Sequence, residues 1–246
     1  DIEIDKVTVS DKGEGTTPLE GATIELFEGT DTTGKSIWDN DGKADAKIPG
    51  SILKVDTTYT LVETAAPNGY AVASNIVFKI GEDGKITTVS QAAEGTDKDQ
   101  NVIVMLDNAI ADITINKVEV SDKGEGTAPL KDATLELYKA DSEGKPTGDK
   151  IWTNDGVATS TIPGSKLEAD TEYVLVETAA PKGYEIASNI TFKIGKDGSI
   201  ETLSQEAYKT SDKDNRVIVM LDDATVIEDI EIDKVTVSDK GEGTTP

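Results

Sequence analysis

Apolar and polar residues alternate along much of the chain, which is the period of a β-strand with one buried face. The alternation is clear in IEIDK (2–6), ATIEL (22–26) and YTLVE (59–63). Asp83-Gly84 and Asp197-Gly198 each lie between two alternating runs, where a hairpin turn is expected. No segment keeps a helical period with capping residues. The pattern therefore predicts an all-β fold, an immunoglobulin-like β-sandwich of roughly seven to nine short strands in each unit.

The chain contains two copies of one unit, and this repeat sets the predicted domains. Three segments of the first copy return almost unchanged in the second: DIEIDKVTVSDKGEGTTPL (1–19) as DITINKVEVSDKGEGTAPL (112–130), LVETAAPNGY (61–70) as LVETAAPKGY (175–184), and NVIVMLDNA (101–109) as RVIVMLDDA (216–224). We expect one domain at 1–109 and another at 110–226. The second copy is slightly longer where KADSEGKPTGDKIW (139–152) replaces EGTDTTGKSIW (28–38), and this insertion predicts a surface loop.

A third copy begins near the end of the sequence. Residues 229–246, DIEIDKVTVSDKGEGTTP, are identical to residues 1–18. We therefore expect 227–246 to hold the incomplete start of a third unit, with Lys234 on its first strand. The chain is accordingly expected to be an excerpt from a longer array. The rest of the third sandwich would come either from the same chain further on or from a neighbouring chain by strand addition.

Composition narrows the possible functions. The formal charge is −24, from 24 Lys and Arg against 48 Asp and Glu, and such a field repels nucleic acids and anionic membranes. No apolar run approaches the ~20 residues of a membrane span. The sequence has no Cys and no His, which removes disulfides, thiolate sites and the usual general base. The oxygen-rich segments DNDG (39–42) and TDKDQN (96–101) lack the spacing of an EF-hand loop, so we expect neither a metal nor a cofactor.

Three ionisable residues stand where the strand pattern requires apolar ones. Lys6 continues the inward parity of its strand, Glu63 does so in another strand, and Asp107 ends the apolar run VIVML. The second copy repeats all three residues, as Lys117, Glu177 and Asp222. Burying them is costly unless they pair or neutralise one another. One outcome is an ordinary salt bridge between the Lys and the Asp, with the Glu as a neighbour.

A covalent bond is the other outcome, and the three residue types are sufficient for it. Burial in a low dielectric favours the neutral amine of a lysine, which is then a nucleophile. A buried glutamic acid beside a second carboxyl keeps its proton, polarises the Asp carbonyl and carries protons to the leaving hydroxyl. The product is a neutral amide that leaves no buried charge. Such a crosslink would also reinforce a core that is thin, since only 36% of the residues are hydrophobic and 4% aromatic.

Four motifs follow one another in the first unit: an early-strand Lys, PLEGATIEL (18–26), VETAAPNGY (62–70) and a final strand IVMLD (103–107). In this order they resemble the CnaB domain family of Gram-positive collagen-binding adhesins and pilins, including the fibronectin-binding adhesin domain that was split into a reactive tag and catcher. The resemblance implies a prealbumin-like, immunoglobulin-like sandwich closed by an internal isopeptide bond.

The resemblance also assigns a role to each buried residue. It implies that the nucleophiles are Lys6 and Lys117, the proton shuttles Glu63 and Glu177, and the electrophiles Asp107 and Asp222. Two adjacent residues, Asn108 and Asp223, are also chemically competent acceptors. Asp107 and Asp222 are favoured because Asp occupies that position in both units.

The function implied by the resemblance is that of a structural spacer in a cell-wall-anchored adhesin or fibre, outside a Gram-positive cell. We expect no enzyme activity beyond a single-turnover crosslink. Expected partners are neighbouring repeats of the same chain and like chains in a fibre, with a host ligand bound elsewhere in the parent protein and no nucleic acid or membrane. A host-matrix-binding adhesin module is the alternative, but a dedicated binding domain should carry distinctive insertions. A hydrolase with paired carboxylates is disfavoured because the crosslink already uses Glu63 and Asp107.

Overall fold

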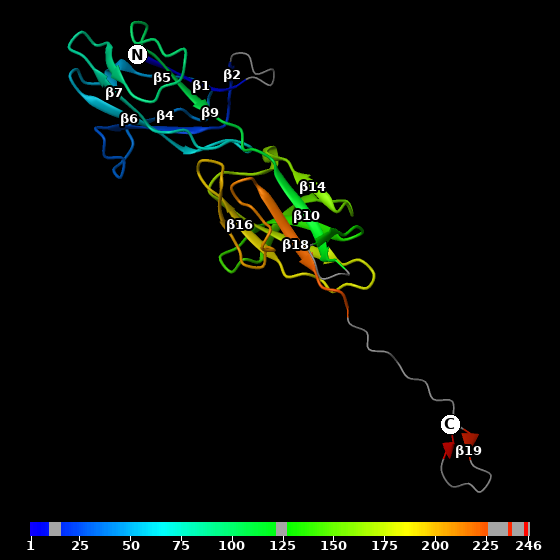
Figure 1. The fold of residues 1–246 in the computed structure, drawn as a ribbon. Coiled ribbons are helices and arrows are strands. Elements are labelled where there is room, and N and C mark those ends of the chain that lie inside the picture. Colours follow the sequence, from blue (N-terminus) through cyan, green and yellow to red (C-terminus); the bar gives the residue numbers. More distant parts are fainter. Residues whose placement is uncertain (10–15, 122–126, 226–235, 238–243, 246) are drawn as a thin grey trace.

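The structure, a computed structural model, describes residues 1–9, 16–121, 127–225, 236–237 and 244–245. Two successive β-rich units are followed by a short pair of strands, and β9 (Val102–Asp107) leads into β10 (Ile113–Val120) of the second unit (Figure 1). Beyond two 3-10 turns, η1 (Gly50–Ile52) and η2 (Gly164–Lys166), the described residues contain no helix. Nothing helical in these ranges has the length and hydropathy of a membrane span. The predicted all-β fold class is confirmed.

Two sheets form the first unit. One contains β1 (Ile2–Val9), with β2 (Thr16–Pro18) and β5 (Asp45–Ile48) on one edge and β9 on the other. The other sheet has the order β4-β3-β6-β7-β8. Its strands are β3 (Thr23–Glu28), β4 (Trp38–Asp39), β6 (Thr58–Ala65), β7 (Ile76–Ile80) and β8 (Ile86–Val89). Because β1 and β9 pair in parallel, the first and last strands of the unit are direct neighbours.

The core of the first unit is filled by the inward residues of both sheets. Ile4 of β1 and Leu26 of β3 are fully buried in it, and the rings of Tyr59 and Phe78 stack with centroids 5.6 Å apart. Side chains two residues apart on a strand face the same side. Lys6, two residues beyond Ile4, is therefore directed into this core, as the alternation predicts.

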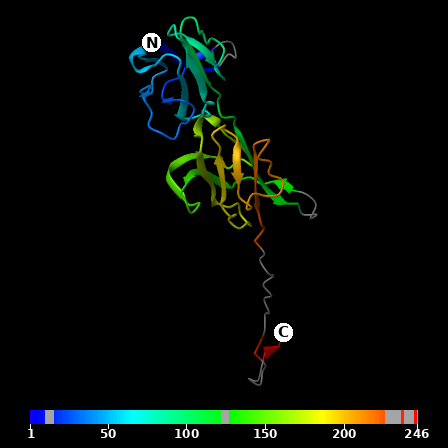
Figure 2. The same ribbon diagram turned by 90° about the vertical axis from the view of Figure 1, so that its left-hand side faces the viewer.

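The second unit repeats the arrangement strand for strand. β10 pairs with β11, β14 and parallel β18, and the other sheet has the order β13-β12-β15-β16-β17. These strands are β11 (Thr127–Pro129), β12 (Thr134–Ala140), β13 (Pro146–Thr153), β14 (Thr159–Ile162), β15 (Thr171–Ala179), β16 (Ile190–Ile194), β17 (Ile200–Leu203) and β18 (Val217–Asp222). The predicted hairpins at Asp83-Gly84 and Asp197-Gly198 are confirmed as the β7–β8 and β16–β17 turns. Seen from the side, the two units follow one another, and the strands described for each unit form separate sheets (Figure 2).

The insertion of the second unit forms a strand, so its prediction as a loop was wrong. β13 has 8 residues, whereas its counterpart β4 has 2. Before β13, the Asp141 carboxylate accepts the N–H groups of Glu143 and Lys145, each at 2.9 Å, and Gly144 supplies a positive φ of 76°. This tight turn brings the added residues back along β12, where they pair. Residues 146–150 are exposed, so the insertion does lie on the surface.

Part of the third copy is also described. β19 (Thr236–Val237) pairs antiparallel with β20 (Thr244–Thr245) in a two-stranded sheet of their own. Their register, Thr236 beside Thr245, corresponds to that of Thr8 beside Thr17 in the identical segment at the start of the chain. TTP (16–18) is thus a short strand, which its sequence did not predict. Lys234 and residues 11–15 lie outside the described residues.

Candidate functional site

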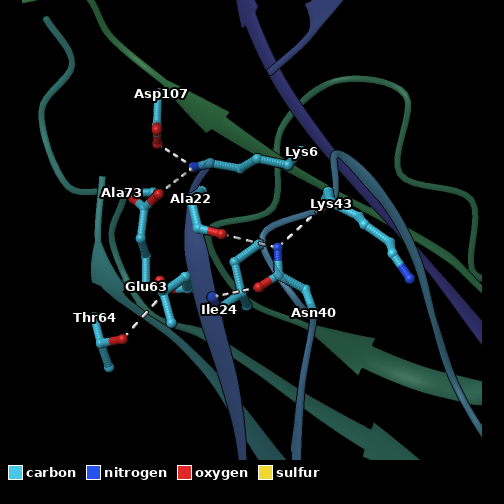
Figure 3. Close-up of polar contacts among 10 residues, drawn as sticks. Lys6, Ala22, Ile24, Asn40, Lys43, Glu63, Thr64, Ala73 and Asp107 are labelled. Carbon is cyan, nitrogen blue, oxygen red and sulfur yellow. Dashed lines mark hydrogen bonds and ion pairs between the residues drawn. The ribbon is translucent and has the colours of Figure 1, made fainter. Parts of the chain in front are cut away.

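Lys6 and Asp107 come from neighbouring strands of one sheet, and Glu63 comes from the other. The β1–β9 register places Lys6 beside Met105, and Asp107 is the next residue of β9 on that face. Glu63 lies on β6, beside Ile24 of β3. All three side chains are buried, with 0% of Lys6 and Asp107 and 3% of Glu63 exposed. Their polar ends converge between the sheets (Figure 3).

The Lys6 side chain lies between two carboxyl groups. Its Nζ donates a short hydrogen bond to Asp107 Oδ1 and lies 3.0 Å from Glu63 Oε1 (Figure 3). The other oxygen of Glu63, Oε2, accepts a hydrogen bond from the backbone N–H of Ala73 at 2.5 Å. This backbone contact orients the Glu63 carboxyl so that Oε1 faces Lys6.

Two buried carboxyl oxygens lack a hydrogen bond. Among the described residues, no hydrogen bond reaches Asp107 Oδ2, and Glu63 Oε1 has only its ion pair with Lys6, although the two carboxyl groups interact directly. A proton held on one carboxyl and donated to the other would satisfy both atoms. The geometry therefore fits a site in which one carboxyl is a neutral acid.

The titration of the aspartates agrees with this arrangement. Burial raises the pKa of Asp107 to about 7, even though the adjacent Lys6 ammonium lowers it, and the neighbouring Glu63 carboxyl adds to the rise. Burial likewise raises the pKa of Asp222 to about 6, against the effect of Lys117. A carboxyl of this kind holds its proton close to neutral pH, and the protonated acid is the form that an amine can attack.

The second unit brings its three predicted residues together in the same way. Lys117 Nζ donates a short hydrogen bond to Asp222 Oδ1 and lies 3.2 Å from Glu177 Oε1. Glu177 Oε2 accepts a hydrogen bond from the Ala187 N–H at 2.7 Å. Glu177 comes from β15, whereas Lys117 and Asp222 come from the paired strands β10 and β18.

The two alternative acceptors lie away from this cluster. Asn108 and Asp223 each follow the last inward residue of the final strand, and both side chains are exposed. Their backbone carbonyls accept hydrogen bonds, Asn108 from the Ala71 N–H at 2.9 Å and Asp223 from the Glu185 N–H at 3.0 Å. Strand alternation explains the difference, because the residue after an inward one faces outward.

A buried amide near the site was missed in the sequence. Asn40, within DNDG (39–42), is only 2% exposed. Its Oδ1 accepts the Ile24 N–H at 2.8 Å, and its Nδ2 donates to the carbonyls of Ala22 at 3.1 Å and Lys43 at 2.9 Å (Figure 3). Asn154 does the same in the second unit. The signal was the recurrence of Asn-Asp-Gly after the same Trp in both copies, at 38–42 and 152–156.

Fold and site together define a class: tandem all-β sandwich domains, each with a buried Lys, Glu and Asp cluster that bridges its first and last strands. Residues 5–94 and 111–209 match the SpaA domain, described as a prealbumin-like fold domain. The chain belongs to this family, and both of its units carry the fold.

Several solved structures are similar to the chain. The C-terminal fragment of the pilus adhesin SpaC from Lactobacillus rhamnosus GG is 17% identical over 93% of this chain and 99% of that one, with a TM-score of 0.44. The shaft pilin SpaA from the same organism is 15% identical over 92% of this chain and 98% of that one, with a TM-score of 0.37. The TIE protein of Bacillus anthracis is 22% identical over 89% of this chain and 33% of that one, with a TM-score of 0.32. No protein with a curated description matches the chain.

Proposed function

We propose that the chain is a structural spacer from the stalk of a Gram-positive surface protein, an adhesin or a pilus fibre, and that each domain closes on itself through a CnaB-type isopeptide bond. One bond joins Lys6 to Asp107 and the other joins Lys117 to Asp222. The observation that carries the proposal is the buried Lys-to-Asp contact beside a buried Glu, present in both domains. Membership of the SpaA family and the CnaB-like motifs support this setting.

The reaction is a condensation that needs no cofactor. The neutral Lys6 amine attacks the Asp107 carboxyl carbon, a C–N bond forms and a C–O bond breaks. Glu63 takes the proton that leaves the nitrogen and gives one to the departing hydroxyl, so water is the only other product. Atoms and charge balance, because an amine and a carboxylic acid give an amide and water. The chain consumes its own side chains and is therefore not an enzyme with turnover.

Burial explains why such a reaction proceeds inside the fold. An ammonium and two carboxyl groups in a core carry a large desolvation penalty, and their mutual attraction repays it only in part. The amide product is neutral and leaves the adjacent glutamic acid as a hydrogen-bond donor. The penalty is thus removed permanently rather than balanced by pairing.

The bond also explains the mechanical role. It joins the first strand of each domain to the last, across 101 residues in the first domain and 105 in the second. Tension that enters at β1 and leaves at β9 then passes through the covalent bond and bypasses the residues between. By analogy with disulfides, closing a loop of ~100 residues adds about 5 kcal/mol of stability. A stalk built from such domains resists extension without a thick core.

Intact-mass spectrometry of the purified chain tests the proposal. Each closed domain should lower the mass by roughly 18 Da, the mass of the water lost. A deficit of two waters agrees with Asp107 and Asp222 as acceptors. A deficit of one water and one ammonia would instead indicate Asn108 in the first domain, and no deficit would refute the crosslink.

Single substitutions show which domain accounts for each lost water. Glu63→Ala removes the proton carrier but keeps both reactants, so the first domain should fold without its crosslink and the chain should lose one water instead of two. Asn108→Ala is the matched control, because it changes the neighbouring exposed residue and should leave two waters lost. Normal crosslinking in Glu63→Ala would show that Glu63 is not the proton carrier.

A further inference from the structure

The chain has a single arginine, Arg216, which lies where the two domains meet. Its Nε donates to the carbonyl of Asp112 at 3.1 Å, and its two terminal nitrogens donate to the carbonyls of Ala111 and Gly198, both at 2.7 Å. The carboxylates of Asp112 and Asp197 are close enough to interact with the cation. A planar guanidinium with several fixed donors is suited to holding separate backbone segments together.

The segments that Arg216 holds are parts of the domain junction. Residues 111–112 belong to the linker between β9 and β10, and Gly198 belongs to the β16–β17 turn of the second domain. The same turn receives the first domain, because the Val72 N–H donates to the Lys196 carbonyl at 2.8 Å. Arg216 therefore ties the linker to the turn on which the first domain rests.

A second contact closes the other side of the junction. The Gly69 N–H donates to the carbonyl of Leu167 at 2.7 Å. A Cβ on Gly69 would lie 2.9 Å from Ser165 Cα, so the two backbones approach as closely as glycine allows. Ile110, the third residue after β9, is 5% exposed and belongs to the core of the second domain. The described junction thus includes close backbone contacts and one buried linker side chain.

The corresponding positions in the other copy lack these features. Asn101 stands in place of Arg216, and its side chain accepts the Ile86 N–H at 3.1 Å within its own domain. Exposed Thr225 stands in place of Ile110. The sequence after the second domain, LDDATVIEDIEIDK, also has two more residues than LDNAIADITINK, which joins the first domain to the second.

We propose that Arg216 holds the two domains as one rigid pair, and that the junction between one pair and the next lacks this clasp. Residues 229–246 repeat the start of the first domain, so the period of the sequence is the pair. Junctions with and without the clasp then alternate along the array. The proposal goes beyond the crosslinks and does not depend on them, because no residue of either buried cluster takes part in the junction.

Distance measurement between spin labels tests the rigid junction in the 246-residue chain. The sequence has no cysteine, so Lys35→Cys and Ser142→Cys place one label on an exposed residue of each domain. We expect a single narrow distance distribution for this background. Arg216→Asn, which copies the first domain, should broaden it. Arg216→Lys keeps the positive charge but loses the planar guanidinium with its several donors, and it should broaden the distribution less.

Asn101→Arg is the matched control. It makes the reverse change away from the junction and should leave the distribution unchanged. If Arg216→Asn melts the second domain, Arg216→Lys decides the result. If the folded Arg216 variants give a distance distribution as narrow as that of the labelled background, the proposed role of Arg216 is wrong.

The alternation is tested in a chain that carries residues 1–228 twice in succession. Labels across its central junction should give a broader distribution than labels across residues 108–112. Equal widths at both junctions would overturn the alternation of junctions with and without the clasp.

Discussion

In the first domain, Lys6 Nζ lies 3.0 Å from Glu63 Oε1, and in the second domain the matching atoms of Lys117 and Glu177 lie 3.2 Å apart. The geometry of the buried cluster is therefore nearly the same in the two domains, whereas a surface ion pair differs between them. Glu28 pairs with Lys54 in the first domain, while the aligned positions in the second domain hold Lys139 and Glu168, with the charges exchanged. The buried cluster keeps the same residues and nearly the same geometry in both copies, because polar groups inside a core depend on specific protein partners. Exposed polarity tolerates reversal, because water and either sign of partner serve equally well.

Removing the lysine of one domain should produce the largest difference in stability between the two domains. Lys6→Met keeps most of the length of the side chain but removes the amine, so the crosslink cannot form and two buried carboxyl groups stay unreacted. Loss of the crosslink removes about 5 kcal/mol, and the two buried carboxyl groups add a desolvation cost that the neutral amide avoids. We expect calorimetry to show the first domain melting far below the second. Lys117→Met should reverse that order, and an unchanged first transition would contradict the role given to Lys6.

Replacing the buried amide should affect both domains equally. Asn40→Ala leaves the Ile24 N–H and the carbonyls of Ala22 and Lys43 without their partner, at a cost of about 1–3 kcal/mol for each group that stays buried and unpaired. Asn154→Ala should lower the second domain's melting temperature by a similar amount. The crosslinks should still form in both variants, which intact mass would show. A destabilisation confined to one domain would mean that the two amides are not equivalent.

The pH dependence of crosslinking should distinguish the two sites. The reaction needs a neutral amine beside two carboxylic acids. This state has the same number of protons as an ammonium beside one carboxylic acid and one carboxylate, so the two interconvert by moving a proton within the cluster. The cluster loses one proton when the pH exceeds the pKa of the aspartate, about 7 for Asp107 and about 6 for Asp222. The rate should then fall about tenfold per pH unit, starting at lower pH in the second domain. Refolding at several pH values, followed by peptide mass mapping, measures this; identical profiles would contradict it.

The same raised pKa makes the stability of an uncrosslinked first domain depend on pH. The folded state binds the proton more tightly than the unfolded chain does, since burial raises the pKa of Asp107. This contribution is complete below the ordinary aspartate pKa and disappears as the pH rises through about 7. Newly folded, uncrosslinked domains should therefore be more resistant to urea at pH 5 than at pH 8.

Exchanging the exposed charges should have the smallest effect. Glu28→Lys puts two cations together in the first domain and should lower its melting temperature slightly at low salt. Adding Lys54→Glu copies the second domain and should restore it, because the pair is solvent-exposed and either polarity is attractive. The difference should disappear at high salt. A double variant less stable than the single one would show that the sign of each charge matters locally.

The sequence predicts the buried cluster well, because a charged residue at an apolar parity is visible without any structure. Lys6 and Glu63 both continue alternating runs, and Asp107 ends one. Asn40 escaped prediction because Asn-Asp-Gly is a typical turn sequence, and only the folded chain shows its amide facing Ile24. Arg216 escaped it because one of its contacts, to Ala111, lies 105 residues away in the chain. The alternation along a strand predicts whether a residue faces the core or the solvent. It does not predict which distant backbone segment a long side chain will contact.

The parallel pairing of β1 and β9 determines how a domain responds when its ends are pulled. The chain enters at the start of β1 and leaves at the end of β9, and the two strands are in register from Glu3–Val102 to Thr8–Asp107. The two points of attachment are therefore at opposite ends of the same ladder. A pull slides one strand along the other and strains every backbone hydrogen bond of that ladder at once, whereas an antiparallel hairpin pulled at its open end peels apart one bond at a time. The backbone ladder alone therefore resists extension in shear, with or without a covalent bond between the two strands.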